Sequence, residues 1–459
     1  MMEFSPMRPA GAALHTEAQA KAAADPMGIS MARMLVVIAL IGAPLAIGAV
    51  EPWAWILLGL LAYVALFLWA LGSVQQGALR FVWSPLYIPL IVFLLWGLVQ
   101  YWGRFTLDRS ATRESLVLLA VDGTLFFLTA QLYATAGKQT WRGLGLAVVA
   151  FAGLLALFSI LQFASGTHRI YGRIDTPAYL FGPYVNPDHY AGLMEMLIPV
   201  AALYIVGQRK RLPYATLALL LFAAAVALAS LLLSGSRAGL IALSVEVAML
   251  FVIFGFSGPR KTEGARLAMV VATTLLAGAL LFSWEDPGWV LNRLSLLTHV
   301  KGHAWTDEMA TRKSFAKDSL RMLLGHPVSG VGLGSFMTAY PSYQSYPSDW
   351  WVNHAHNDYV EAAAETGIVG VAAVLTAMAL FFHLAFAGLA RRVGTERGLI
   401  RLGAAIGCCG LLVHSFFDFN LHIPANAAWF AVLAGLATTA DFAGAKKNFR
   451  YEEQRHAAI

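Results

Sequence analysis

The chain has 459 residues, of which 58% are hydrophobic and only 13% are charged. This charged fraction is about half of that usual in soluble domains, and one soluble core could not bury so much apolar surface. The formal net charge of +6 does not indicate a nucleic-acid partner, because the basic residues are divided among many short loops.

The apolar residues form stretches of roughly 17–24 residues, the length at which a helix crosses a bilayer. We therefore predict an all-α polytopic membrane protein with about twelve transmembrane helices. The expected spans cover residues 34–50, 53–72, 84–102, 115–134, 143–163, 190–207, 213–232, 236–257, 266–283, 367–390, 400–417 and 423–441. Residues 1–33 lack periodicity, which predicts a disordered tail before an uncleaved signal anchor.

Lysine and arginine recur in every second loop of this plan, and the positive-inside rule assigns such loops to the cytoplasm. These residues are Arg80, Lys138, Arg142, Arg209, Lys210, Arg211, Arg260, Lys261, Arg391, Arg392, Arg397, Lys446, Lys447 and Arg450. We expect both termini to be cytoplasmic, with residues 442–459 as a second tail.

One long loop, residues 284–366, precedes the tenth span on the opposite face, and long loops in compact proteins usually carry function. Within it, the spacing of apolar residues over 306–325 predicts an amphipathic helix. The glycine-rich stretch 326–336 predicts a tight turn, and no strand–helix unit surrounds it to make a phosphate loop. Residues 357–367 predict a short helix that ends at Gly367.

Arg237 stands in a very short loop between the seventh and eighth spans, on the face that otherwise avoids basic loops. A charge at that depth is costly and usually has a partner, either a carboxylate such as Glu246 or an anionic ligand. A guanidinium matches phosphate oxygens with two parallel hydrogen bonds, so the functional interpretation is an anionic head group. Arg173 and Arg312 would join Arg237 if the loops fold back over the bundle.

Polar side chains crowd between Asn353 and Asp358, just before the tenth span. His356 is a candidate general base, because an imidazole with an ordinary pKa of about 6.5 accepts a proton at neutral pH. The alternative is a histidine that hydrogen-bonds the start of the following helix, and His354 could exchange roles with it. Asp358 or Asn353 is expected to orient the imidazole. No metal-ligand spacing is visible, so no metal and no other cofactor is expected.

Four stretches together resemble the O-antigen ligase and polymerase (Wzy-like) family of bacterial membrane glycosyltransferases. They cover residues 171–193, 233–243, 311–336 and 354–370. The plan of twelve spans with one long extracytoplasmic loop before helix 10 is similar to the family as well. The resemblance therefore extends over nearly the whole chain and implies a GT-C-like architecture.

Such enzymes transfer a glycan from an undecaprenyl-pyrophosphate carrier to an acceptor hydroxyl at the periplasmic face of the inner membrane. The resemblance implies that Arg237 and Arg312 hold the pyrophosphate while His356 takes the proton of the acceptor. The implied partners are the lipid-linked glycan donor, a glycan or lipid-core acceptor, the lipid bilayer and polysaccharide assembly proteins. The implied reaction is a metal-independent displacement that inverts the anomeric centre.

Further candidate residues are added to Arg237, Arg312 and His356. Arg173 is a further pyrophosphate contact, and the supporting residues are His354, Asn357, Asn186 and His189. Asp188 departs from the family pattern, which often has a second asparagine there. The resemblance leaves open an O-antigen ligase, a polysaccharide polymerase and a protein O-glycosyltransferase. The rivals from other classes are a flippase for lipid-linked glycans and a structural subunit of an export complex.

Overall fold

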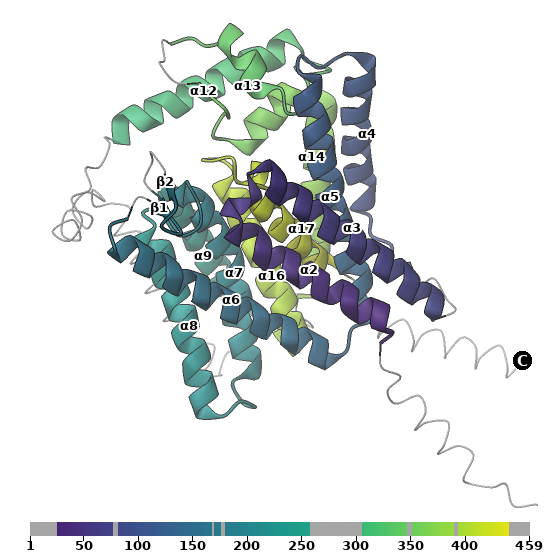
Figure 1. Cartoon of the computed structure of the whole chain (residues 1–459), viewed down its shortest axis with the longest axis vertical. Helices are drawn as coiled ribbons and strands as arrows, with labels where there is room; N and C mark the ends of the chain where they lie inside the picture. Colours follow the sequence, from purple (N-terminus) through teal and green to yellow (C-terminus); the bar gives the residue numbers. More distant parts are fainter. Residues whose placement is uncertain are drawn as a thin grey trace, which may run out of the picture.

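The computed structural model describes residues 25–76, 81–167, 169–175, 180–257, 305–346, 351–389 and 393–439. Within them the chain is almost entirely helical (Figure 1). The apolar helices are α2 (Met27–Leu45), α3 (Pro52–Gln75), α4 (Tyr87–Gly103), α5 (Arg109–Ala134), α6 (Lys138–Ala164), α7 (Pro187–Gln208), α8 (Tyr214–Leu233), α9 (Arg237–Ser257), α14 (Asp358–Phe386), α16 (Glu396–His414) and α17 (Pro424–Thr438).

Nine of these helices are long and apolar enough to cross a membrane, and α4 and α17 are shorter apolar helices. This finding confirms an all-α polytopic membrane protein, and each of these apolar helices overlaps one expected span. The expected span 266–283 and most of both expected tails lie outside the described residues. The count of twelve therefore stays a prediction.

The first helix begins earlier than the hydropathy pattern predicts, at Met27 rather than near residue 34. Arg33 lies inside it and is buried. Its guanidinium forms an ion pair with Asp25, and its Nε and Nη2 donate to the carbonyl oxygen of Leu132 at 3.1 and 2.9 Å. Because these partners neutralise the charge, an arginine is tolerated within the helix instead of marking its flank.

Helices α7 and α16 pack together at the centre of the bundle. A Cβ atom at Gly403 would lie 2.6 Å from Cα of Val200, and one at Gly407 would lie 2.5 Å from the Met196 carbonyl oxygen. Small residues allow this close approach of two helix backbones, as is common in membranes. The pair fixes the position of the N-terminus of α7 relative to the turn that follows α16.

The loops that carry the expected cytoplasmic charges meet at the other end of α16. Glu396, its first residue, accepts from Arg142 Nε at 2.8 Å and from Gln208 Nε2 at 3.0 Å, and it forms an ion pair with Arg211. A helix of 19 residues is about 28 Å long. The basic loops are therefore gathered far from the turn that follows His414.

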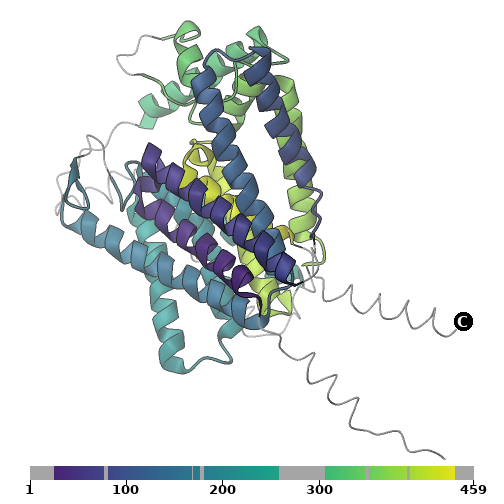
Figure 2. The ribbon, with the colours of Figure 1, turned by 45° about the vertical axis from the view of Figure 1, so that its right-hand side comes forward.

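The connection between α9 and α14 contains α12 (Trp305–Gly325), α13 (Phe336–Ala339) and η2 (Tyr340–Ser342). These elements, which we call the cap, lie over the end of the bundle at the top of Figures 1 and 2. Helix α12 confirms the predicted amphipathic helix. The predicted glycine turn is confirmed too, since Gly330, Gly332 and Gly334 all have positive φ.

The glycine turn fastens the cap to α14. Val331 N donates to the Ala364 carbonyl at 3.0 Å, and the Glu365 carboxylate accepts from Gly334 N at 2.8 Å and Phe336 N at 2.9 Å. A Cβ atom at Gly330 would lie 2.2 Å from the backbone of Glu365, so the backbones of the two segments are in direct contact there. The predicted helix boundary at Gly367 appears as a kink, with φ of 61°, after which α14 continues.

A small hairpin of β1 (Arg169–Ile170) and β2 (Ile174–Asp175) stands before α7. The strands pair antiparallel with Arg169 opposite Asp175, and the two side chains form an ion pair of 2.6 Å. Arg173 lies in the turn of this hairpin.

Candidate active site

His356 and Asp418 form the centre of the candidate site. His356 Nδ1 lies 2.9 Å from Asp418 Oδ1. Asp418 is completely buried in the turn between α16 and η3 (Asn420–His422), whereas the His356 side chain is 33% exposed. A buried carboxylate therefore orients an imidazole that solutes can reach.

The sequence-based assignment of Asp358 or Asn353 as the residue that orients His356 is wrong. Asp358 instead accepts from His422 Nδ1 at 2.8 Å and from Leu421 N at 3.2 Å, while Asn353 is exposed. Both residues are close to His356 in the chain, but the partner that the fold supplies is 62 positions away. Long-range pairing of this kind leaves no trace in local spacing.

The backbone around His356 is held against the end of α16. His356 itself has φ of 49°, in the left-handed region, a conformation that surrounding contacts must maintain in a non-glycine residue. Asn357 Nδ2 donates to the Phe416 carbonyl at 3.0 Å, and Asp358 N donates to the Ser415 carbonyl at 2.9 Å. Asn357 also caps α14, accepting from the amides of Tyr359 and Val360, and so supports the histidine as expected from its place in the motif.

The electrostatics of the site keep Asp418 ionised. Burial alone would raise the pKa of Asp418, but its hydrogen bond with His356 and the charges of neighbouring histidines hold that pKa well below its ordinary value. His189 Nε2 lies 3.5 Å from Asp418 Oδ2 on the side away from His356. Asn186 caps α7 through Asp188 N at 2.8 Å, and its Nδ2 lies 3.5 Å from His189 Nε2.

Three histidines surround the ring of Phe419, the residue that follows Asp418. His354 stacks on it with ring centroids 4.1 Å apart, and His356 and His189 meet it edge-on at 4.9 and 4.7 Å. Phe315, from the cap helix α12, stacks on the other side of His356 at 5.8 Å. The structure thus brings His189, His354 and His356 into one group.

Arg312 reaches this group from the cap. It lies about one helical turn before Phe315 on α12, and its Nη2 is 4.0 Å from Asp188 Oδ2, next to His189. The family motifs named Arg312 and His356 without showing that they lie close together. The fold places both where α12 meets the N-terminus of α7. Asp188, where the family often has asparagine, is the carboxylate that Arg312 approaches.

Arg237 is the first residue of α9, after the short connection 234–236. Helix α9 packs on α7 there, since a Cβ atom at Gly239 would lie 2.8 Å from Ala191 Cβ. Arg237 thus lies at the end of the bundle where α7 begins. The alternative pairing with Glu246 does not occur, because both carboxylate oxygens of Glu246 are buried without a hydrogen-bond partner among the described residues.

Arg173 is exposed in the hairpin turn. In the part of the chain that the structure describes, it forms no hydrogen bond or ion pair with the group around His356. The structure therefore unites His356, His354, His189, Asn186, Asn357 and Arg312, places Arg237 at the same end of α7, and leaves Arg173 apart.

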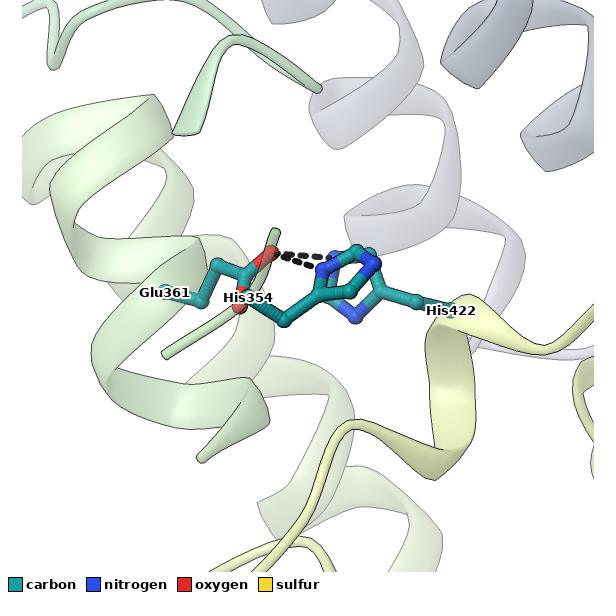
Figure 3. A group of neighbouring side chains, drawn as sticks. All are labelled: His354, Glu361 and His422. Carbon is teal, nitrogen blue, oxygen red and sulfur yellow. Dashed lines mark hydrogen bonds and ion pairs between the residues drawn. The ribbon is translucent and has the colours of Figure 1, made fainter. Parts of the chain in front are cut away.

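A second polar group lies beside the first and was missed from the sequence. His354 Nδ1 is 2.7 Å and His422 Nε2 is 3.3 Å from Glu361 Oε1, as Figure 3 shows. Three ligand atoms from these residues lie within 4.8 Å of one another, so the group can hold a metal ion. Sequence spacing did not reveal this group, because its three residues come together only in the folded chain, and the expectation of no metal stays untested.

This second group attracts positive charge. Burial alone would lower the pKa of His422, yet the carboxylates of Glu361 and Asp358 raise it to about 10. The structure also separates His354 from the role of His356. His354 Nδ1 contacts Glu361, and not Asp418, the carboxylate that contacts His356. The two histidines of the motif thus have separate carboxylate partners.

The O-antigen ligase family model matches residues 222–375. This part of the chain is similar to O-antigen ligases. The match confirms the resemblance inferred from the four sequence stretches, and it includes Arg237, Arg312, His354 and His356. A search of curated proteins finds no match for the chain. Four residues of the candidate site lie outside the O-antigen ligase match and join it only in space: Asn186, His189, Asp418 and His422. Arg173 also lies outside the match.

Proposed function

We propose that this protein transfers a glycan from undecaprenyl pyrophosphate to an acceptor hydroxyl, with His356 as the general base. The observation that carries the proposal is the His356–Asp418 pair. An ionised carboxylate only accepts hydrogen bonds, so Nδ1 of His356 is the protonated nitrogen. Nε2 then holds the lone pair and takes the proton from the acceptor, as in other histidine–aspartate pairs.

The arginines would bind and neutralise the pyrophosphate. Arg312 projects from α12 toward the N-terminus of α7, where its Nη2 lies 4.0 Å from Asp188 Oδ2. Arg237 begins α9 at the same end of α7. Preorganised cations stabilise the charge that grows on a leaving group. We retain Arg173 as a third contact to the pyrophosphate, because this residue is exposed and its guanidinium is accessible.

The reaction is a single displacement at the anomeric carbon. The acceptor oxygen forms the new bond to this carbon while the bond to the phosphate oxygen breaks, and undecaprenyl pyrophosphate departs with the bonding electrons. The proton of the acceptor moves to His356 Nε2. One displacement inverts the anomeric configuration, and no step calls on a metal ion.

An apolar pocket supports a lipid-linked substrate. It has a volume of about 340 Å³ and lies between α12 and α14, with Leu320, Leu323 and Ala363 in its wall. Tyr359 and Val360 also contribute to the wall, only a few residues from His356. A pocket of this character suits part of an isoprenoid chain, because it removes apolar surface from water or from head groups.

The site is assigned to the periplasmic face of the inner membrane. The support for this side is the gathering of basic loops around Glu396, at the far end of α16 from Asp418. The cap then lies outside the cell membrane, where lipid-linked glycans are presented after translocation.

The deciding experiment is transfer by the purified full chain in lipid nanodiscs. Lipid-linked glycan is supplied with a lipid core, a free oligosaccharide or an acceptor protein, and both the product and the released undecaprenyl pyrophosphate are measured. We expect one acceptor class to be glycosylated with inversion. Movement of the donor across the bilayer without any product would support the flippase and contradict the proposal.

A further inference from the structure

We infer that His354, Glu361 and His422 form a binding site for one divalent transition-metal ion, and that its donor set best suits zinc. The inference concerns metal binding and does not depend on the proposed glycosyl transfer. Two imidazole nitrogens and a carboxylate oxygen are the ligands that zinc takes in sites with one open position.

The hydrogen-bond pattern of His422 supports a cation between these side chains. His422 Nδ1 lies 2.8 Å from Asp358 Oδ1, a contact in which the ring must donate. A neutral His422 therefore carries its lone pair on Nε2, which faces Glu361 Oε1 at 3.3 Å. Two electron-rich atoms in that position favour a positive charge between them, which either a second proton on Nε2 or a bound metal ion can supply. The identity and proximity of the three ligands are what favour the metal ion.

The other two ligands are held ready for the ion. Glu361 Oε2 accepts from Ala355 N at 2.7 Å, which turns Oε1 toward both imidazoles. His354 stacks on Phe419, and its ring centroid is 4.8 Å from that of His422. The three ligand atoms lie within 4.8 Å of one another, whereas atoms bound to one zinc ion lie about 3.3 Å apart when each bond is about 2.1 Å. Small side-chain rotations close this difference.

The surroundings have the features of a metal site beyond its ligands. Asp358 accepts the second N–H of His422, which is the usual arrangement that fixes the tautomer of a metal-bound histidine. Glu361 and Asp358 are both buried, at 1% and 5% exposure, and two buried carboxylates need a compensating charge. The His354 and His422 side chains are 28% and 30% exposed, so an ion can enter from outside.

The ion would connect three segments of the chain next to His356. His354 belongs to the loop before α14, Glu361 to the first turns of α14, and His422 to η3. His356 lies between His354 and Glu361 along the chain, and its partner Asp418 lies just before η3. The ion would therefore hold the base and its carboxylate in position without touching either of them.

Metal binding is tested on the purified full chain with a tag that contains no histidine. The protein is treated with a chelator, dialysed, and titrated with Zn²⁺ by calorimetry, and with Co²⁺ while the visible spectrum is recorded. We expect one equivalent of each metal and the absorption bands of four-coordinate Co²⁺. Fewer than 0.2 equivalents of bound Zn²⁺ (roughly background) at saturation would overturn the inference, and would assign the positive charge to a second proton on His422.

Variants locate the site. Glu361→Gln and His422→Gln should each lower Zn²⁺ affinity at least about 100-fold, and Asp358→Asn should lower it about 10- to 100-fold because it acts through His422. His326→Gln, which changes an exposed histidine of the cap connection, should bind like the wild type. Wild-type affinity in Glu361→Gln and His422→Gln would overturn the assignment.

One variant separates this inference from the proposed function. His356→Ala should bind Zn²⁺ with wild-type stoichiometry even if transfer is lost, because His356 is not a ligand. Loss of Zn²⁺ binding in His356→Ala together with retention in Glu361→Gln would place the ion at Asp418 and contradict the site inferred here.

Discussion

Asp418 accepts a hydrogen bond from His356 across 2.9 Å. His356 lies just before the start of α14, whereas Asp418 lies just after the end of α16. Asp418 is fully buried and His356 is partly exposed. The carboxylate is therefore shielded from substrate, and its effect on any reaction must act through the imidazole. This division separates the residue that contacts substrate from the residue that positions it.

Asp418→Asn tests that division. The amide can offer a donor to Nδ1, which favours the wrong tautomer and leaves Nε2 protonated, so we expect transfer to fall about 10²- to 10⁴-fold. Donor binding should change little, since the base acts mainly in the transition state. The turnover rate and donor affinity are measured separately.

Two controls accompany this variant. Asn353→Ala alters an exposed neighbour of His356 and should keep wild-type transfer. The double variant Asp418→Asn with His356→Ala should be no slower than His356→Ala alone, because both changes remove the same base. Additive losses would mean that Asp418 acts independently of His356.

Arg237→Lys should impair transfer strongly although the charge is kept. Lysine is a point charge and cannot form the two parallel hydrogen bonds that guanidinium makes with phosphate oxygens. The loss is measured as transfer per folded protein, and Arg113→Lys, on an exposed position of α5, is the matched control. Full activity of Arg237→Lys at normal expression would show that only charge or packing matters there.

Gly330→Ala should destabilise the attachment of the cap. Both Gly330 and Gly166 have positive φ, but a Cβ atom at Gly330 would lie 2.2 Å from the Glu365 backbone whereas nothing lies within 4 Å at Gly166. Gly166→Ala should therefore show only the cost of the left-handed conformation, about 1–2 kcal/mol. The two variants are compared by thermal unfolding and by limited proteolysis between α12 and α14. Equal behaviour would contradict the close backbone contact.

The charged loops predict which face of the membrane carries the site, and cysteine labelling can test this prediction directly. A single cysteine at Ser345 should react with a membrane-impermeant reagent added from the periplasmic side, and one at Lys210 should react only after the membrane is opened. Both are introduced into a chain in which Cys408 and Cys409 are replaced by alanine, and the unmodified double variant serves as the blank. Protection of residue 345 in intact cells would refute the proposed orientation.

Local patterns predicted the parts of the fold that local energetics decide. Hydropathy located the helices because a bilayer-spanning segment must satisfy its own backbone hydrogen bonds. The start of a helix near Asn357 and a break at Gly367 were predicted for a similar reason, since both depend on neighbouring backbone, although α14 continues beyond Gly367 as a kinked helix. The start of α2 was not, because Arg33 is accommodated in the helix by an ion pair with Asp25 and by hydrogen bonds to the carbonyl of Leu132, 99 positions away.

The candidate site divides in the same way. Arg312 and His356 carry motifs of the O-antigen ligase domain and were recognised from them. The residue that orients His356 was expected to be Asp358 or Asn353, whereas the structure supplies Asp418, because this pairing depends on how α16 docks in the bundle. The group of His354, Glu361 and His422 was missed for the same reason, since only tertiary packing brings η3 beside α14.

The glycine contacts between α16 and α7 bring the two helix backbones into direct contact. Asp418 and His189 are attached to these two helices, so we expect them to stay together when a substrate binds. Arg312 and Phe315 belong to the cap, which is joined to the bundle through the glycine turn and Glu365. If the proposed transfer occurs here, room for a sugar chain would have to come from displacement of α12. The reach of the cap, rather than the width of the helix bundle, would then set the largest substrate that the site admits.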